Sequence, residues 1–286
     1  MSAESRSARI VRRLSKGPLY VVLIAVALFW LLPTIGLGVL SLREPSDNAE
    51  SGWWTALTEP SQLTIQNYRD LFESGSTIPG SLWNTLQITV PTTILLVVIS
   101  ALAAYAFAFI DFPGRDVVFI LVVALLVVPV QVALIPIAEL YGNIGIGGSL
   151  ASVILFHVGF GLPLGIFLLR NFFVGIPVEL LEAARMDGAG ELRIFTRVVA
   201  PLGLPAIAAL AIFQFLWVWN DLLVALIFAG PENAPITVAI MQETRQFSGS
   251  IDVIAPGAFV SLLLPLTVFL AFQRYFVQGL LAGSSR

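Results

Sequence analysis

The sequence contains no cysteine and a single histidine, His157, among its 286 residues. Without cysteine there is no disulfide framework, no thiol nucleophile and no cysteine-based metal site. One histidine cannot build a histidine-cluster metal site, and neither a paired set of acids nor a Ser/His/Asp constellation is recognisable in the chain. These absences argue against a membrane enzyme and against a resident metal.

Lysine is equally scarce, because Lys16 in the N-terminal tail is the only one. A phosphate-binding Walker A loop needs a lysine directly after its glycine-rich turn, to hold the phosphates. The glycine-rich connector 141–149 has no lysine after it and no strand pattern before it, so it is not such a loop. If ATP drives the activity of this protein, a separate polypeptide must therefore hydrolyse it.

Charged residues make up only 12% of the chain and hydrophobic residues 57%, whereas soluble domains carry roughly 25% charged residues. This balance predicts an all-α polytopic membrane protein. We expect one transmembrane domain, residues 19–277, between a polar N-terminal tail (1–18) and a short C-terminal tail (278–286). Six apolar runs are each long enough to cross a hydrocarbon core about 30 Å thick. The runs are residues 19–40, 84–110, 117–140, 150–173, 201–228 and 254–276.

Proline and glycine interrupt several of these runs. Pro129 and Pro136 lie inside the third run, and we expect Gly161 and Pro163 to break the fourth. The basic residues then indicate the topology. Of the 15, only Arg43, Arg69 and Arg245 fall in segments that this arrangement places outside. Since cytoplasmic loops carry the excess of arginine and lysine, we predict that both termini are cytoplasmic.

The most patterned polar segment is the loop between the fourth and fifth runs, PVELLEAARMDGAGELRIFTRVVAPLGLP, residues 177–205. Pro177 suits the first turn of a helix, and Glu179 lies near the positive end of its dipole. Gly188 suits the left-handed residue just past the end of that helix. We therefore predict a short helix, a sharp turn and a second short helix that starts near Glu191 and runs towards Pro201.

The spacing in this loop is also specific. Glu182, Ala183 and Ala184 are followed after three residues by Gly188, and after nine more by the run from Val198 to Pro201. This pattern resembles the EAA loop of ABC importer permeases, and the flanking Asp187, Ala189 and Phe195 resemble its sugar-importer branch, the maltose-type permeases. Val198 and Ala200 depart from the isoleucine and leucine of that pattern. Further stretches resemble the same branch, namely Asn67–Tyr68, Leu71–Phe72, Asn84–Leu86 and Gln273–Gly283.

The resemblance implies a six-helix permease of the type I importer architecture in a bacterial or archaeal plasma membrane. It implies a second homologous permease, giving a heterodimer, two ABC ATPase subunits that bind ATP and magnesium, and an extracytoplasmic solute-binding protein. No cofactor is expected in this chain, and no nucleic acid among its partners. The loop 177–201 would couple to the ATPase, with small alanines seated in a groove of that subunit and acidic side chains at its rim. The coupling residues implied are Glu182, Ala183, Ala184, Asp187, Gly188 and Ala189.

Polar residues inside apolar runs are expensive in a membrane and therefore suggest function. Asn220 and Asp221 follow Trp217 near the outer end of the fifth run, and Gln131 lies in the third. These four residues could line a solute pathway, with tryptophan stacking on sugar rings. Asn220 and Asp221 could equally hydrogen-bond neighbouring helices or reach the outer interface. His157 is weighed as a packed residue rather than a ligand.

The function predicted from the sequence is a permease subunit of an ATP-driven, binding-protein-dependent importer of a disaccharide, oligosaccharide or α-glucoside. The sugar comes from the resemblance alone, because nothing in the residues selects one. Two alternatives stay open, namely an ATP-independent secondary transporter or channel, and an ABC permease for a non-sugar solute.

Overall fold

The computed structural model describes residues 17–73, 76–246 and 251–284 of the chain, and its named elements there are all helices. The first part comprises α2 (Gly17–Ser41), α3 (Pro45–Glu50), η1 (Trp53–Leu57), η2 (Pro60–Gln62) and α4 (Gln66–Phe72). The middle comprises α5 (Ile78–Phe109), α6 (Arg115–Ala124), η3 (Leu125–Val127), α7 (Val130–Asn143) and α8 (Leu150–Phe173). The last part comprises α9 (Val178–Met186), α10 (Glu191–Ile194), η4 (Phe195–Val199), α11 (Ala200–Trp219), α12 (Leu223–Phe228), η5 (Pro231–Asn233), α13 (Ile236–Gln246) and α14 (Ile251–Ser284).

Five of the described helices are long and apolar enough to cross a membrane, and a bent pair, α6–η3 with α7, makes a sixth span if it counts as one. The predicted all-α, membrane-spanning fold class is therefore confirmed. The chain divides into two compact units, residues 1–76 with 246–259 (unit 1) and residues 77–245 with 260–286 (unit 2).

Unit 1 contains α2 and a compact loop that is built around the buried guanidinium of Arg43. This side chain is 0% exposed. It donates hydrogen bonds to the carbonyl oxygens of Asp47 and Ser51 and to the side chains of Gln62 and Thr55. Carbonyl and hydroxyl acceptors thus satisfy its donors, as a buried charge requires. One arginine therefore holds together a loop that the sequence marks only as polar.

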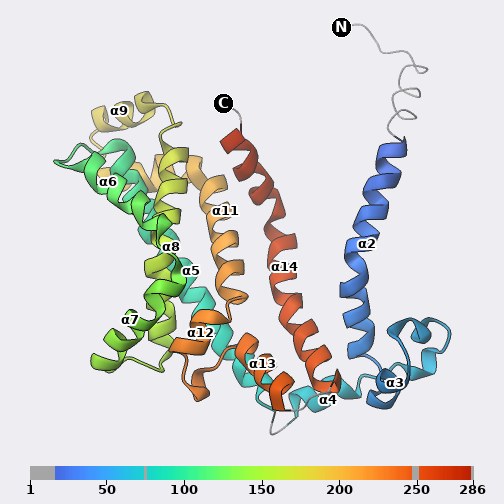
Figure 1. Ribbon diagram of the computed structural model, residues 1–286. Coiled ribbons are helices and arrows are strands. Elements are labelled where there is room, and N and C mark those ends of the chain that lie inside the picture. Colours follow the sequence, from blue (N-terminus) through green and yellow to red (C-terminus); the bar gives the residue numbers. More distant parts are fainter. Residues whose placement is uncertain (1–16, 74–75, 247–250, 285–286) are drawn as a thin grey trace, which may run out of the picture. The chain divides into compact units, whose positions relative to one another are not determined.

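Unit 2 has a core of three helices, α5, α8 and α11, which pack side by side (Figure 1). Small residues on α8 allow the close approach. A Cβ atom at Gly161 would collide with the side chain of Leu96 on α5, and one at Gly165 would collide with Ser100 on α5. The backbone of α8 therefore approaches α5 at the two positions of a G-x-x-x-G spacing, which is common where membrane helices pack tightly.

The third apolar run is not one helix but two, and the pair can still form one broken span. α6 and η3 end at Val127, α7 begins at Val130, and the two halves are bent by 101°. Pro129 stands at the start of α7 with extended backbone, φ −66° and ψ 135°. It lacks an N–H, and the residue before a proline avoids helical angles, so the helix stops there.

The expectation that Gly161 and Pro163 break the fourth span is wrong, because α8 runs without interruption from Leu150 to Phe173. Neighbouring helices can compensate for a proline in a membrane helix, and Pro163 is itself buried. The predicted fifth span is also divided. α11 ends at Trp219, and the short helix α12 begins only at Leu223.

Candidate functional site

The loop that the sequence singles out forms the predicted helix–turn–helix. α9 begins directly after Pro177, its N-cap residue. The helix ends at the C-cap Asp187, and Gly188 follows with φ +77°, in the left-handed region. The N–H of Gly188 donates to the carbonyl of Arg185 at 2.9 Å. Gly188 therefore takes the position past the helix end that glycine alone adopts without strain.

The second helix of the loop continues beyond the predicted end. α10 passes through the π-helical turn η4 directly into α11, so that Glu191–Trp219 is one continuous span. Pro201 was expected to end the short helix, but it lies in the first turn of α11. The wide turn before it accommodates a residue that lacks an N–H.

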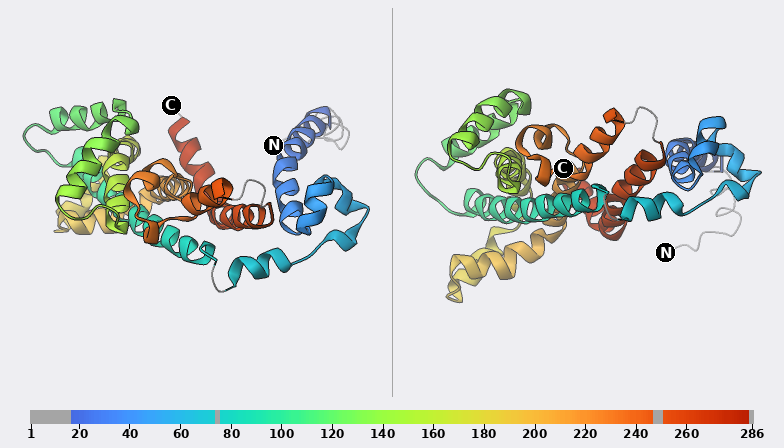
Figure 2. Two further views of the ribbon diagram at one scale, coloured as in Figure 1. Left: turned by 60° about the horizontal axis from the view of Figure 1, so that its bottom comes forward. Right: turned by 90° about the horizontal axis from the view of Figure 1, so that it is seen from below.

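The loop has a buried side and an exposed side. Leu181 and Ile194 are both 0% exposed and join the apolar cluster that contains Leu169 of α8 and Ala104 of α5. The six predicted coupling residues divide between the two sides. Glu182, Ala183, Asp187 and Gly188 are exposed, whereas Ala184 and Ala189 are half-buried and pack against the same cluster. Figure 2 shows α9, in yellow, projecting from the packed helices of unit 2.

Sequence reasoning missed the largest apolar group on the exposed side. Met186 is 89% exposed, and Leu192 just beyond the turn is 69% exposed. Met186 lies four residues after Glu182, so both share one helix face. A methionine on the polar face of a short helix was the available signal, because its flexible side chain suits a protein-binding surface.

A charged pair closes the loop on itself and was also missed. Arg185 of α9 donates from Nε to Oε1 of Glu191 at 3.0 Å and from Nη2 to Oε2 at 3.3 Å. The hydrogen bond that Arg185 donates to Glu191 raises the pKa of the Arg185 guanidinium above its usual value. The two helices of the loop are therefore joined by a forked ion pair across the Gly188 turn.

The structure brings together two of the four predicted pathway residues, Trp217 and Asp221, around His157. The His157 ring is 1% exposed and meets the Trp217 ring edge-on at 5.2 Å between centroids. Nε2 of His157 lies 3.6 Å from Oδ2 of Asp221. Gln131 is exposed on α7, and Asn220 is exposed with its amide donating to the carbonyl of Leu216 on its own helix. Neither takes part in the described hydrogen bonds of the Asp221 cluster.

Contacts within the protein account for a carboxylate at position 221, without any contact to a solute. Its carboxylate accepts the backbone N–H of Val224 at 3.4 Å and of Ala225 at 3.0 Å, and so caps the first turn of α12. Nδ1 of His157 lies 2.9 Å from the carbonyl of Val153 and must donate to it.

We expect Asp221→Ala to destabilise the protein, because it removes a helix cap worth about 1 kcal/mol and a buried partner worth about 1–3 kcal/mol. Asp221→Asn should keep most of this stability, since its amide can still cap α12 and face His157. Thermal unfolding in detergent measures both effects. If both variants unfold like the parent protein and lose only solute uptake, Asp221 contacts solute and its structural role is refuted.

Comparison with known proteins agrees with this architecture. The chain is 46% identical over 274 residues to the osmoprotective compounds uptake permease protein GgtD of Synechocystis, which covers 94% of this chain and 92% of that protein. It is 44% identical over 239 residues to the alpha-glucoside transport system permease protein AglG of Rhizobium meliloti, across 81% of this chain and 62% of AglG.

A crystal structure of a bacterial ABC transporter that imports the polysaccharide alginate has the same fold, with a TM-score of 0.73 and 22% identity. The match covers 96% of this chain and all of the matched chain. The family of binding-protein-dependent transport system inner membrane components matches residues 96–281, which include the whole loop 177–201. The chain therefore belongs to this family and is a multi-pass inner-membrane permease subunit of a binding-protein-dependent ABC importer, which leaves ATP hydrolysis to a separate subunit.

Proposed function

We propose that this permease docks its ATPase through the exposed side of the loop 177–201 and imports an α-glucoside or a closely related small carbohydrate. It would form half of the translocation pathway beside a second, homologous permease. Two ATPase subunits would dock from the cytoplasm, and an extracytoplasmic solute-binding protein would deliver the solute.

One observation carries the coupling role, namely that the loop is buried on one side and exposed on the other. Leu181 and Ile194 are fully buried in the helix core, so a force on the loop reaches that core. On the opposite side, α9 presents the acidic Glu182 and Asp187 around the apolar Met186. An apolar anchor inside a polar rim is the usual composition of a protein-binding surface.

The broken third span supports a second permease. The backbone between η3 and α7 is irregular, and side chains on both sides of it are well exposed in this chain, with Val127 at 82% and Val132 at 65%. In a membrane, irregular backbone is tolerated only where other protein buries it or where it lines a water-filled cavity. A second permease beside this break would bury the irregular backbone, and a solute pathway between the two chains would supply the water-filled cavity.

The names of two relatives support the proposed substrate class. AglG is named for alpha-glucoside transport and GgtD for the uptake of osmoprotective compounds. A small, neutral, polyhydroxylated glycoside fits both names. Exposed Asn220 and Gln131 offer amide groups, which can both donate hydrogen bonds to hydroxyl groups and accept them.

Uptake by the complete complex in lipid vesicles tests this proposal. We expect ATP-dependent accumulation of radiolabelled α-glucosides such as trehalose or sucrose, only with the solute-binding protein present, and weak competition by glycine betaine. Uptake without any ATPase would refute ATP coupling and favour a secondary transporter. ATP-dependent uptake of betaine without that of any carbohydrate would refute the substrate class and keep the coupling.

A further inference from the structure

The loop 177–201 is tied to a helix that is remote in the sequence. Glu191, at the start of α10, binds Arg185 on one side and accepts a hydrogen bond from the hydroxyl of Tyr105 on the other. Tyr105 belongs to the last two turns of α5, 86 residues before Glu191. One carboxylate therefore joins both helices of the loop to the second span.

Tyr105 is held firmly enough to transmit a displacement. Its side chain is 4% exposed. The ring packs against Phe109 of its own helix at 5.6 Å and against Phe195 of η4 at 5.5 Å between centroids. Because aromatic contacts fix the ring from both sides, the hydroxyl can follow Glu191 only if the end of α5 follows with it.

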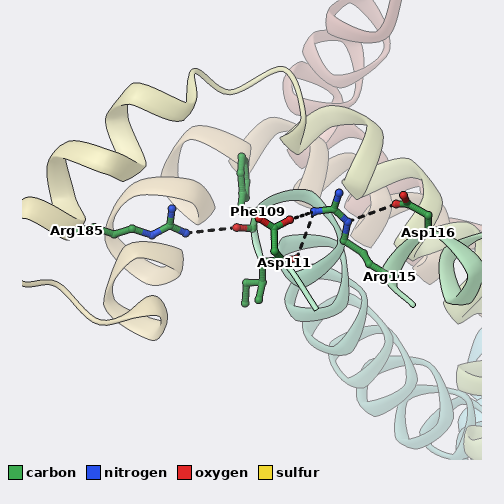
Figure 3. A network of polar contacts seen from close by, with 6 residues as sticks. Phe109, Asp111, Arg115, Asp116 and Arg185 are labelled. Atoms are coloured by element: carbon green, nitrogen blue, oxygen red, sulfur yellow. Dashed lines mark hydrogen bonds and ion pairs between the residues drawn. The ribbon is translucent and has the colours of Figure 1, made fainter. Parts of the chain in front are cut away.

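A second tie reaches the same end of α5. Nη2 of Arg185 donates to the carbonyl oxygen of Phe109, the last residue of that helix, at 3.4 Å (Figure 3). Carbonyl groups at a helix C-terminus lack partners within the helix and attract cations. Arg185 therefore binds a place on α5 where a positive charge is favourable.

The segment that follows α5 is stiffened by its own arginine. Arg115 donates to Oδ1 of Asp111 at 2.7 Å and to the carbonyl of Ile110 at 3.4 Å (Figure 3). These bonds stay within the turn between α5 and α6. Arg185 therefore supplies a bond from the loop to this end of α5, whereas Arg115 keeps the turn itself compact.

From these contacts we propose that Glu191 is a positioning residue, which transmits movement of α9 to the cytoplasmic end of the second span through Tyr105. The inference rests on the proposed docking of an ATPase on the loop. It names the contacts through which a movement of the docked loop reaches the membrane-spanning helices. The ion pair with Arg185 is half-exposed and contributes little stability alone. The hydrogen bond from Tyr105 is the more specific contact, because the packed ring holds its hydroxyl in one place, against the Glu191 carboxylate.

Tyr105→Phe is the test, because it removes one hydroxyl and keeps the ring. We expect ATPase subunits to co-purify as with the parent chain and ATP to be hydrolysed, while solute imported per ATP falls about tenfold, the change expected for one hydrogen bond to a charged group. A loss of folded complex would lower hydrolysis and uptake together and leave their ratio unchanged. Tyr141→Phe is the matched control, because that ring packs against Phe228 on α12.

Variants of Glu191 extend the test. Glu191→Gln keeps an acceptor for the Tyr105 hydroxyl. It should therefore lower the amount of solute imported per ATP less than Glu191→Ala does. Tyr105→Phe added to Glu191→Ala should lower the ratio no further, because coupled residues are not additive. An unchanged ratio in Tyr105→Phe, or additive losses in the double variant, would overturn this route. If the parent chain neither binds an ATPase nor imports solute with it, the proposed function itself fails.

Discussion

Replacing Gly188 by valine should strongly reduce ATP-driven import. Gly188 has φ +77°, a conformation that costs an ordinary L-residue about 1–2 kcal/mol and a β-branched one more. The turn would rearrange, and with it the angle between α9 and α10. We expect uptake to fall by at least about tenfold, since 1.4 kcal/mol already corresponds to that factor. Uptake into vesicles and co-purification of the ATPase measure the loss.

Two further variants distinguish backbone strain at a left-handed glycine from a specific effect on ATPase docking. Asparagine tolerates left-handed backbone, so Gly188→Asn should retain most of the uptake. Gly114 also has a left-handed φ, +80°, with no atom within 4 Å of a Cβ, and it lies outside the loop. Gly114→Val should therefore keep the ATPase bound. Full uptake by Gly188→Val, or equal loss of ATPase binding in both valine variants, would show that the turn is not specific to docking.

Gly165→Val should strongly destabilise the helix core. Its Cβ would collide with the side chain of Ser100 on α5 and lie 3.3 Å from Cδ2 of Leu210 on α11. Both neighbours are buried, at 0% and 3% exposure. Overpacking a core costs about 1–3 kcal/mol, and here two helices must move apart. We expect a lower unfolding temperature and less monodisperse protein in detergent, measured by tryptophan fluorescence and size exclusion.

Gly159→Val is the matched control on the same helix. A Cβ at Gly159 meets no atom within 4 Å, so this variant should unfold near the temperature of the parent protein. The difference between the two variants then reports the contact with α5 and α11 rather than helix propensity. Equal stability of both variants would mean that α8 does not pack through Gly165.

The local signals of the loop 177–201 predicted its structure well. A proline in the first turn and a glycine past the last one act on neighbouring backbone only, so both can be predicted from the sequence. The left-handed Gly188 is confirmed, whereas α9 begins one residue later than predicted, at Val178, with Pro177 as its N-cap. The coupling role of the loop and the solute contacts stay predictions.

The prolines show where such reading fails. Pro129 stops a helix, whereas Pro136 lies inside α7 and Pro163 inside α8. The difference depends on which neighbouring groups take over the freed carbonyl, and that is a property of the packed bundle. The hydrogen bond between Tyr105 and Glu191 also depends on the packed bundle. The two residues are 86 positions apart in the sequence, and no periodic pattern connects them, so the sequence could not predict it.

The π-helical turn η4 has a consequence for the direction in which the loop points. Such a turn is an α-helical turn with one residue inserted, and one residue advances an α-helix by about 100° of rotation. Phe195–Val199 therefore sets the rotational phase between α10 and α11. A regular α-helix of the same composition would rotate α9 to a different side of the fifth span, and the proposed docking face of α9 would no longer face the ATPase.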